Sequence, residues 1–234
     1  MHLIVGLGNP GREYEGTRHN AGFLVLDELR RRAGIPDFRE KFSGVWAKGD
    51  LFGHPVALLK PMTYMNLSGE SVQPAAAFLK VPPGDVIVIH DELDLGWKDV
   101  RVKVGGGHAG NNGIRSIIQR LGTPDFVRVR VGIGKPGPGF KGDGADWVLS
   151  SFDAMERAEW PDVEAQAIDA LRAILEHGPA AAMNAANTAK GAGGGSAKKA
   201  AKAGKPAERA QRARTQQEER REGGEPGDPE PKKT

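Results

Sequence analysis

The stretch LIVGLGNPGREYEGTRHNAGF, Leu3 to Phe23, decides how the chain begins to fold. It opens with a short apolar run of the kind that forms a buried strand, and apolar residues at helical spacing begin near Ala21. Between the two lies a glycine-containing segment in which the spacing G-x-G-x-x-G is provided by Gly6, Gly8 and Gly11.

That spacing is found in dinucleotide-binding loops, but here the context differs. In such a loop the helix begins directly after the glycines and directs its first amides at a pyrophosphate. In this chain the polar stretch REYEGTRHN follows Gly11, and Pro10 lacks an amide proton. We therefore interpret the glycines as residues of a tight loop that places Asn9 at the end of a strand.

The rest of the chain up to residue 187 alternates between strand and helix patterns. Strands are predicted within residues 43–61, 85–92, 99–106 and 126–134. Helices are predicted over residues 21–34, 68–81, 112–122 and 154–176. Because proline is tolerated in a first helical turn, Pro74 is an alternative start for the second helix. The pattern predicts a single α/β domain over residues 1–187, a twisted mixed sheet with helices on both faces.

Residues 188–234 have a different composition. They contain no Leu, Ile, Val, Phe, Tyr or Trp, and they carry twelve Lys/Arg against seven Asp/Glu. A segment with nothing to bury cannot offset its ordering entropy, so we expect a disordered C-terminal tail. Either it is a solvated tail, or it is a basic arm that adds weak, nonspecific affinity for RNA.

Composition excludes several classes of function. The chain has no Cys, which rules out disulfides, thiolate metal sites and a Cys nucleophile. No apolar run is long enough to span a membrane, and the N-terminus does not have the pattern of a signal peptide. We expect a cytoplasmic protein with no membrane association.

Polar residues at predicted strand ends and helix starts form the candidate site. His19 could act as a general base near neutral pH, and Asp91, at the end of a buried strand, could orient it. Amides that could hold a water or donate to an oxyanion are Asn9, Asn66, Asn111 and Asn112. With no Ser or Cys nucleophile evident, this set favours hydrolysis of an acyl bond by activated water.

Each of these residues also has a purely structural interpretation. His19 could cap the following helix, Asp91 could be a turn carboxylate, and the asparagines could satisfy backbone amides in glycine-rich loops. A metal site is a further alternative, but its residues match no familiar ligand spacing, namely His90, Asp91, Glu92, Asp94 and His108.

Two alternating segments, VRVKV and VRVRV, place valines on one face of each strand and basic residues on the other. The basic residues are Arg101, Lys103, Arg128 and Arg130. They could clamp nucleic-acid phosphates, or they could cover a solvated sheet face and discourage edge pairing.

Five motifs together resemble the bacterial-type peptidyl-tRNA hydrolases. They are GLGNPGREYEGTRHNAGF, LKPMTYMNLSG, HDELDL, GGGHAGNNGI and FVRVRVGIGKP, in the family's order and spacing. The resemblance runs from Leu3 to Asn187. It implies a monomeric α/β enzyme without metal or cofactor and without an obligate protein partner. The implied reaction cleaves the ester between a peptide and the terminal ribose of tRNA, and so recycles tRNA after ribosomes stall.

The resemblance also implies roles at matching positions. His19 is then the general base, Asp91 orients it, and Asn112 positions the water or stabilises the intermediate. The implied substrate contacts, to the acceptor stem and 3′ end of tRNA and to the peptide, are Asn9, Tyr14, Met65, Asn66 and Asn111. The four basic residues of VRVKV and VRVRV are implied contacts to tRNA phosphates.

Two departures from the family pattern stand out. Asn111 occupies a position where the family usually has His, so its role is open. The stretch LDLGWKDV lacks the prolines common after the acidic motif, so its loop could differ in shape. A non-catalytic RNA-binding protein on the same scaffold is the rival hypothesis; the intact set of His19, Asp91 and Asn112 argues against it.

Overall fold

The computed structural model describes residues 1–188, so the prediction for the tail from residue 189 onward lies outside the described residues. The strands are β1 (His2–Gly6), β2 (Arg39–Lys41), β3 (Gly44–Leu51), β4 (His54–Pro61), β5 (Val86–Glu92), β6 (Val100–Val104) and β7 (Val127–Gly132). The α-helices are α1 (Ala21–Arg32), α2 (Gly69–Leu79), α3 (Asn112–Leu121), α4 (Gly144–Leu149) and α5 (Ala154–Thr188). Short 3-10 turns are η1 (Arg18–Asn20), η2 (Met65–Leu67) and η3 (Pro83–Asp85).

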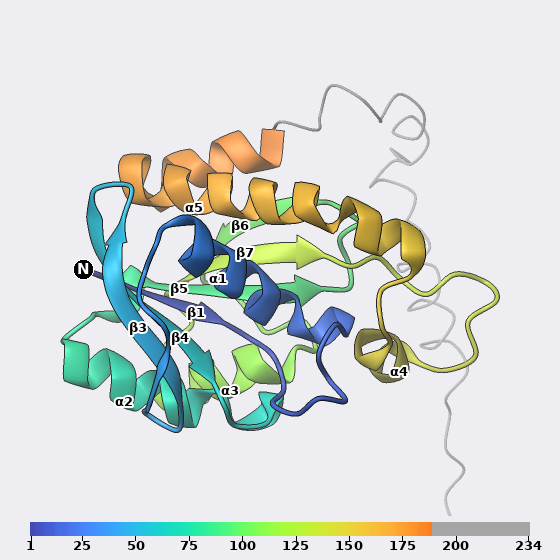
Figure 1. Ribbon diagram of the computed structural model, residues 1–234, viewed down its shortest axis with the longest axis horizontal. Coiled ribbons are helices and arrows are strands. Elements are labelled where there is room, and N and C mark those ends of the chain that lie inside the picture. The colour runs from blue at the N-terminus through green and yellow to red at the C-terminus, as the bar shows by residue number, and fades with distance from the viewer. Residues whose placement is uncertain (189–234) are drawn as a thin grey trace, which may run out of the picture. The chain divides into compact units, whose positions relative to one another are not determined.

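The seven strands form one mixed sheet in the order β2-β3-β4-β1-β5-β7-β6. The four strands β4, β1, β5 and β7 are parallel, while β3 and β6 run antiparallel to the neighbours that they flank. Helices α1 and α5 cover one face, and α2 and α3 cover the other (Figure 1). The predicted α/β fold, with a mixed sheet and helices on both faces, is confirmed.

Alternation along the central strands divides the apolar side chains between two cores. In β5, Ile87 and Ile89 pack toward α1 and α5, whereas Val86 and Val88 pack toward α2 and α3. All seven residues of β5 are buried, as expected for a parallel strand covered on both faces. The last two of them, Asp91 and Glu92, are therefore carboxylates held by the same rigid strand.

The glycines of the opening motif allow α1 to approach β1 closely. A Cβ at Gly6 would lie 2.3 Å from the carbonyl oxygen of Gly22, and a Cβ at Gly22 would lie 2.4 Å from the amide nitrogen of Leu7. A Cβ at Gly8 would lie 2.7 Å from the ring of Phe23. Gly6 and Gly22 therefore allow backbone-to-backbone packing, and Gly8 leaves room for the ring of Phe23, so that the start of α1 lies over the end of β1.

The order of strands creates a switch point at β1. The chain passes from β1 to β4 on one side and later to β5 on the other, so the carboxyl ends of these three strands diverge around one crevice. Open α/β sheets bind ligands in such a crevice. The loops that follow β1, β4 and β5 carry Asn9, Met65 and the end of the acidic motif.

The structure corrects three details of the predicted elements. Helix α2 begins at Gly69, so Pro74 lies inside it and is not its first turn. The predicted helix from Ala154 continues to Thr188, with a break at Gly178 where φ is 80°. Strand β2 was not predicted, because its three residues are all charged and exposed. In the described part of the chain, no helix is long and apolar enough to cross a membrane.

Candidate active site

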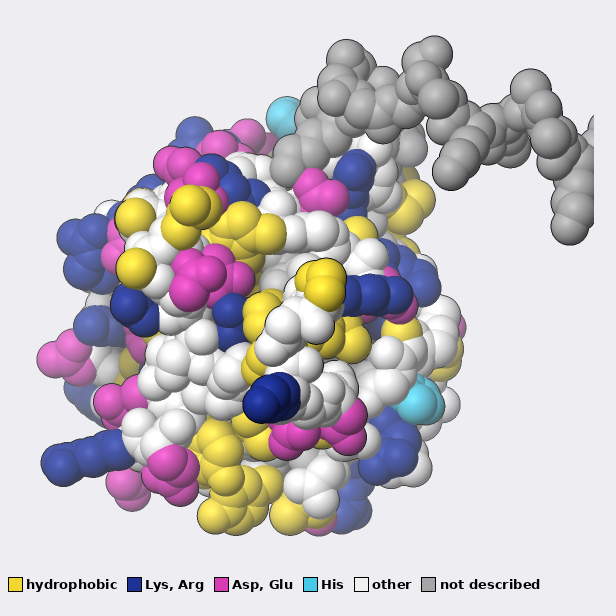
Figure 2. Space-filling view, turned by 90° about the vertical axis from the view of Figure 1, so that its right-hand side faces the viewer, with side chains coloured by type: hydrophobic (Ala, Val, Ile, Leu, Met, Phe, Trp, Pro, Cys, Tyr) yellow, Lys and Arg dark blue, Asp and Glu magenta, His cyan; other side chains and the backbone are white. Residues whose placement is uncertain are grey.

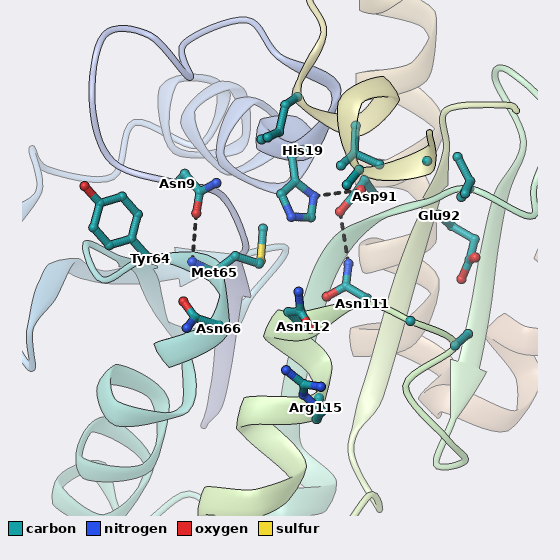
Figure 3. Close-up of a pocket in the computed structure, with 17 residues that line it drawn as sticks. Asn9, His19, Tyr64, Met65, Asn66, Asp91, Glu92, Asn111, Asn112 and Arg115 are labelled. Carbon is teal, nitrogen blue, oxygen red and sulfur yellow. Dashed lines mark hydrogen bonds and ion pairs between the residues drawn. The ribbon is translucent and has the colours of Figure 1, made fainter. Parts of the chain in front are cut away.

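His19 and Asp91 form a hydrogen-bonded pair at the carboxyl edge of the sheet. His19 lies in η1, directly before α1, and its Nδ1 is 2.9 Å from Oδ2 of Asp91 near the end of β5 (Figure 3). The side chain of His19 is 13% exposed and that of Asp91 is 3% exposed. Because a carboxylate only accepts, Nδ1 carries the proton, and Nε2 is left as a proton acceptor at the cleft.

Two opposing effects act on the pKa of His19. Burial lowers the pKa, while the charge of Asp91 and the hydrogen bond to it raise the pKa. The two contributions from Asp91 outweigh burial, so the pKa of His19 is raised above its ordinary value of 6.5. The pair thus holds the imidazole in one tautomer and makes it a stronger base.

Asn111 lies on the other side of the same carboxylate. Its Nδ2 donates to Oδ1 of Asp91 at 3.1 Å, so both oxygens of Asp91 accept a hydrogen bond. Its own Oδ1 accepts from the amides of Gly113 and Ile114 at 3.0 and 3.1 Å, which makes Asn111 the N-cap of α3. The position that departs from the family pattern therefore links the helix to Asp91.

An open cleft of about 590 Å³ adjoins the pair. Of the residues predicted from sequence it is lined by Asn9, His19, Met65, Asn66, Asp91, Asn111 and Asn112. The Oδ1 of Asn9 accepts from the backbone amide of Met65 at 2.7 Å. This bond leaves the side-chain nitrogen of Asn9, Nδ2, facing the cleft (Figure 3). Asn66 is exposed in the middle of η2, and Asn112 is exposed at the start of α3.

The structure adds residues that the sequence reasoning missed. Tyr64 and Arg115 line the cleft, as does one side of α4 with Ala145, Val148 and Leu149. Tyr14 does not line it: its backbone forms the turn that leads to η1. In the sequence, Tyr14 in the glycine-rich opening motif and Tyr64 two residues before Asn66 look equally able to line a site. Only the hydrogen bond that joins Met65, next to Tyr64, to Asn9 in the loop after β1 distinguishes them.

The basic residues of β6 and β7 share one face, as predicted, since Arg101 pairs with Arg130 and Lys103 with Arg128 across the strands. Arg128, however, is 3% exposed, and its guanidinium donates to the carbonyls of residues 106 and 107. Arg128 is therefore not placed to contact a phosphate. The alternating pattern correctly predicted the shared face but not that a glycine-rich loop covers part of it.

Arg130 and Arg101 also form bonds within the protein. Nε of Arg130 is 2.8 Å from Glu92, and Arg101 donates to the backbone carbonyls of Ala186 and Asn187 in α5. Lys103 is half-buried beside the same glycine loop. On the face that bears α4, Lys and Arg side chains are dispersed among acidic and hydrophobic ones (Figure 2). A phosphate clamp on β6 and β7 remains a prediction, now for Lys103 above all.

The residues of the alternative metal site point in different directions. His90 is 2% exposed and its Nδ1 donates to the carbonyl of Asp91 at 2.7 Å, while Asp94 pairs with Lys135 at 2.8 Å. Within residues 1–188, no three His, Asp or Glu side chains are grouped so as to hold a metal ion.

A buried carboxylate, an imidazole with its free nitrogen at a cleft, and several amides around that cleft define a hydrolytic enzyme of the α/β class. The family model for peptidyl-tRNA hydrolase matches residues 3–193. The chain therefore belongs to the peptidyl-tRNA hydrolase family, and it is a hydrolase.

Individual relatives agree with this assignment. A peptidyl-tRNA hydrolase from Sorangium cellulosum is 57% identical over 184 residues, which cover 79% of this chain and 82% of that protein. One from Geotalea daltonii is 49% identical, with 79% of this chain and 95% of that protein covered. The crystal structure of peptidyl-tRNA hydrolase from Acinetobacter baumannii matches with a TM-score of 0.73 at 40% identity, covering 80% of this chain and 94% of that one.

Proposed function

We propose that the chain hydrolyses the ester between the C-terminus of a peptide and the terminal ribose of tRNA, and so returns free tRNA after peptidyl-tRNA leaves the ribosome. The observation that carries this proposal is the pair of His19 and Asp91 at 2.9 Å, beside a cleft lined with amides. The membership of the family supplies the substrate class, and the pair supplies a route for the proton.

In the proposed reaction, Nε2 of His19 takes a proton from a water as the water oxygen bonds to the ester carbonyl carbon. The negative charge of Asp91 stabilises the imidazolium that forms. When the tetrahedral intermediate collapses, the bond to the ribose oxygen breaks and His19 returns the proton to that oxygen. A general base of this kind contributes about 10²–10⁴-fold to the rate.

The amides stabilise charge that develops on the carbonyl oxygen. We assign this donor role to Asn112, which lies in the first turn of α3 and whose side chain makes no hydrogen bond within the described part of the chain. One such donor contributes about 10²–10³-fold. Asn9, Asn66 and Met65 shape the opposite side, where they would hold the 3′ end and the first peptide unit.

Arg115 suggests how the nucleic acid enters. It is exposed on α3, lines the cleft, and projects beside Asn66 and Asn112 (Figure 3). A guanidinium here suits a phosphate of the terminal nucleotides, because phosphate contacts position the strand without reading its sequence.

The test measures release of N-acetylated amino acid from N-acetyl-aminoacyl-tRNA in the presence of EDTA. The native chain should cleave the ester, and His19→Ala should lose almost all turnover while it still folds and binds tRNA. His177→Ala is the matched control, since His177 lies on α5 with its side chain 66% exposed. We expect this control to retain full activity.

Different failures have different meanings. Substantial activity in His19→Ala would contradict the assignment of His19 as the base. Retained tRNA binding without any cleavage by the native chain would favour the rival hypothesis, a non-catalytic RNA-binding protein on this scaffold.

A further inference from the structure

Arg18, the residue before His19, is a buried cation that the proposed reaction does not use. Its side chain is 3% exposed, and its guanidinium spans two segments that are far apart in sequence. It donates to Oγ of Ser150 at 2.6 Å and to the carbonyl of Ser151 at 2.7 Å, and it forms an ion pair with Glu156. All of these partners lie between the end of α4 and the first turns of α5.

The same guanidinium stacks on α4 itself. Its central carbon lies 3.7 Å from the centroid of the Trp147 ring, close enough for a cation–π contact. The backbone reinforces the junction, since the amide of Arg18 donates to the carbonyl of Ser150 at 3.1 Å and Thr17 pairs with Ser151 in an isolated bridge. Arg18 is therefore the point at which η1 and the end of α4 are joined.

Helix α4 has few other attachments. It is six residues long, none of its residues is buried, and neither hydrophobic core includes any of them. Beyond its own capping box at Asp143, the described contacts of its tryptophan are a hydrogen bond from Nε1 to the carbonyl of Gly134 at 2.8 Å and an edge contact with Phe140. Such a short element depends on tertiary contacts for its position.

The opposite side of α4 forms part of the cleft. Ala145, Val148 and Leu149 line it, and they give it an apolar wall across from the amides of η2 and α3. The imidazole of His19 has separate supports: Asp91 on one side and, next in sequence, Asn20, which exchanges hydrogen bonds of 2.8 and 3.0 Å with the backbone of Asn9. The α4 wall and the imidazole of His19 are thus held by different contacts, and Arg18 is the residue that joins the two.

We propose that Arg18 is a positioning residue that fixes the α4 wall at a set distance from His19, and that its loss weakens substrate binding more than it slows the chemical step. This inference rests on the proposed function, because α4 matters for turnover only if an ester substrate occupies the cleft. A wall that contacts substrate equally before and during reaction contributes to KM, whereas the pair of His19 and Asp91 sets kcat.

Arg18→Lys is the variant of choice. Lysine keeps a positive charge beside Glu156 but has neither the planar ring-stacking surface nor the several donors of the guanidinium. The matched control is Arg30→Lys. Arg30 also donates to a backbone carbonyl, that of Ile35 at 3.1 Å, and to a carboxylate, that of Asp37 at 2.8 Å, but it lies away from the cleft.

Two measurements are made on the full chain: steady-state kinetics on N-acetyl-aminoacyl-tRNA and hydrogen exchange of the amides of residues 144–151. For Arg18→Lys we expect KM to rise roughly fivefold or more while kcat changes by less than about twofold, with an unshifted pH–rate profile. The amides of residues 144–151 should exchange faster. Arg30→Lys should match the native chain in both measurements.

Unchanged KM and unchanged exchange in Arg18→Lys would overturn the proposal. A fall in kcat with a shifted pH profile and normal exchange would also overturn it, because Arg18 would then act on His19 directly. If Arg18→Lys does not fold, Trp147→Leu removes the stacked ring from the other side of the contact and should give the same rise in KM. An inactive native chain would refute the proposed function, and the exchange rates alone would then decide whether Arg18 holds α4.

Discussion

At the scale of single residues, the proposed chemistry depends on one carboxylate, Asp91, whose two oxygens contact different side chains. Since the proposed base, His19, accepts a proton only when it is neutral, kcat/KM should rise with pH through the pKa of His19 and then reach a plateau. That pKa is raised above 6.5, because the charge and hydrogen bond of Asp91 outweigh burial. A raised pKa keeps the inactive, protonated form present to higher pH.

Asp91→Asn should shift this profile to lower pH. Without the carboxylate, burial alone acts on His19 and lowers its pKa, while the plateau rate falls by roughly 10²–10⁴-fold because the imidazolium loses its stabilising charge. The measurement is a pH–rate profile of both proteins from about pH 5 to pH 9, the range in which histidine titrates. A midpoint that stays in place or moves upward would show that Asp91 does not control the base.

Asn111 offers a way to separate capping from catalysis. Asn111→Asp retains an acceptor for the amides of Gly113 and Ile114 but replaces the donor to Asp91 with a second negative charge. We expect it to lose less stability than Asn111→Ala, which lacks the cap and should cost about 0.5–2 kcal/mol of unfolding free energy.

In the kinetics the larger effect should come from the other variant: Asn111→Asp should shift the pH–rate profile more than Asn111→Ala does. Asn111→Asp adds negative charge near His19, so the acid limb of the pH–rate profile should move to higher pH, whereas Asn111→Ala should leave it closer to the native position. Urea denaturation gives the stabilities and the pH–rate profiles give the shifts. If Asn111→Asp had a normal profile, the hydrogen bond to Asp91 would have no role in turnover.

At the level of strands and helices, alternation predicted which residues share a face, but it could not predict what covers that face. The buried valines of β6 and β7 lie on the side of α5. The four basic residues alternate with them, although the guanidinium of Arg101 reaches the carbonyls of Ala186 and Asn187 in α5. The loop of residues 105–110 then folds back over Arg128, whose guanidinium donates to two of its carbonyls. This loop leads to Asn111 and Asn112, so we expect Arg128 to support the cleft and not to contact a phosphate.

Lys103→Ala and Arg128→Gln should therefore affect different quantities, the first tRNA binding and the second kcat. Lys103→Ala should weaken tRNA binding and reduce the slope of log K against log salt by roughly one phosphate contact. Arg128→Gln should leave that slope unchanged and lower kcat, because the loop that carries the amides loses its anchor. Binding titrations at several salt concentrations and steady-state kinetics separate the two effects. A reduced slope in Arg128→Gln would return Arg128 to the set of phosphate contacts.

Short elements were the hardest to predict. Helix α4 was not predicted, because it has no buried face and so no hydrophobic period. The only signal for its start is the capping box of Asp143 and Asp146, which the structure shows. The meeting of His19 and Asp91 was easier, because one follows from the start of a helix after β1 and the other from the end of a buried strand. In a sheet with a switch point, those two positions converge.

For the whole molecule, the family match ends at residue 193, while the chain continues to residue 234 with a surplus of basic side chains. We propose that residues 1–187 contain the complete catalytic domain. Within residues 1–188, every residue that lines the cleft lies before residue 150, and both hydrophobic cores are built from residues before 187. Nothing in the proposed reaction requires the residues beyond the match.

Deletion of residues 194–234 should accordingly leave kcat and KM unchanged at low salt. Any contribution of the basic segment to RNA binding is electrostatic, so it would appear as a smaller dependence of KM on salt in the shortened chain. The control is Arg115→Gln in the full chain, which removes a cation at the cleft and should raise KM even at low salt. The two variants distinguish charge that positions the 3′ end from charge that only attracts RNA. A collapse of kcat at low salt on deletion would show that the C-terminal segment contributes to the active site, and that the catalytic domain does not end where the sequence pattern changes.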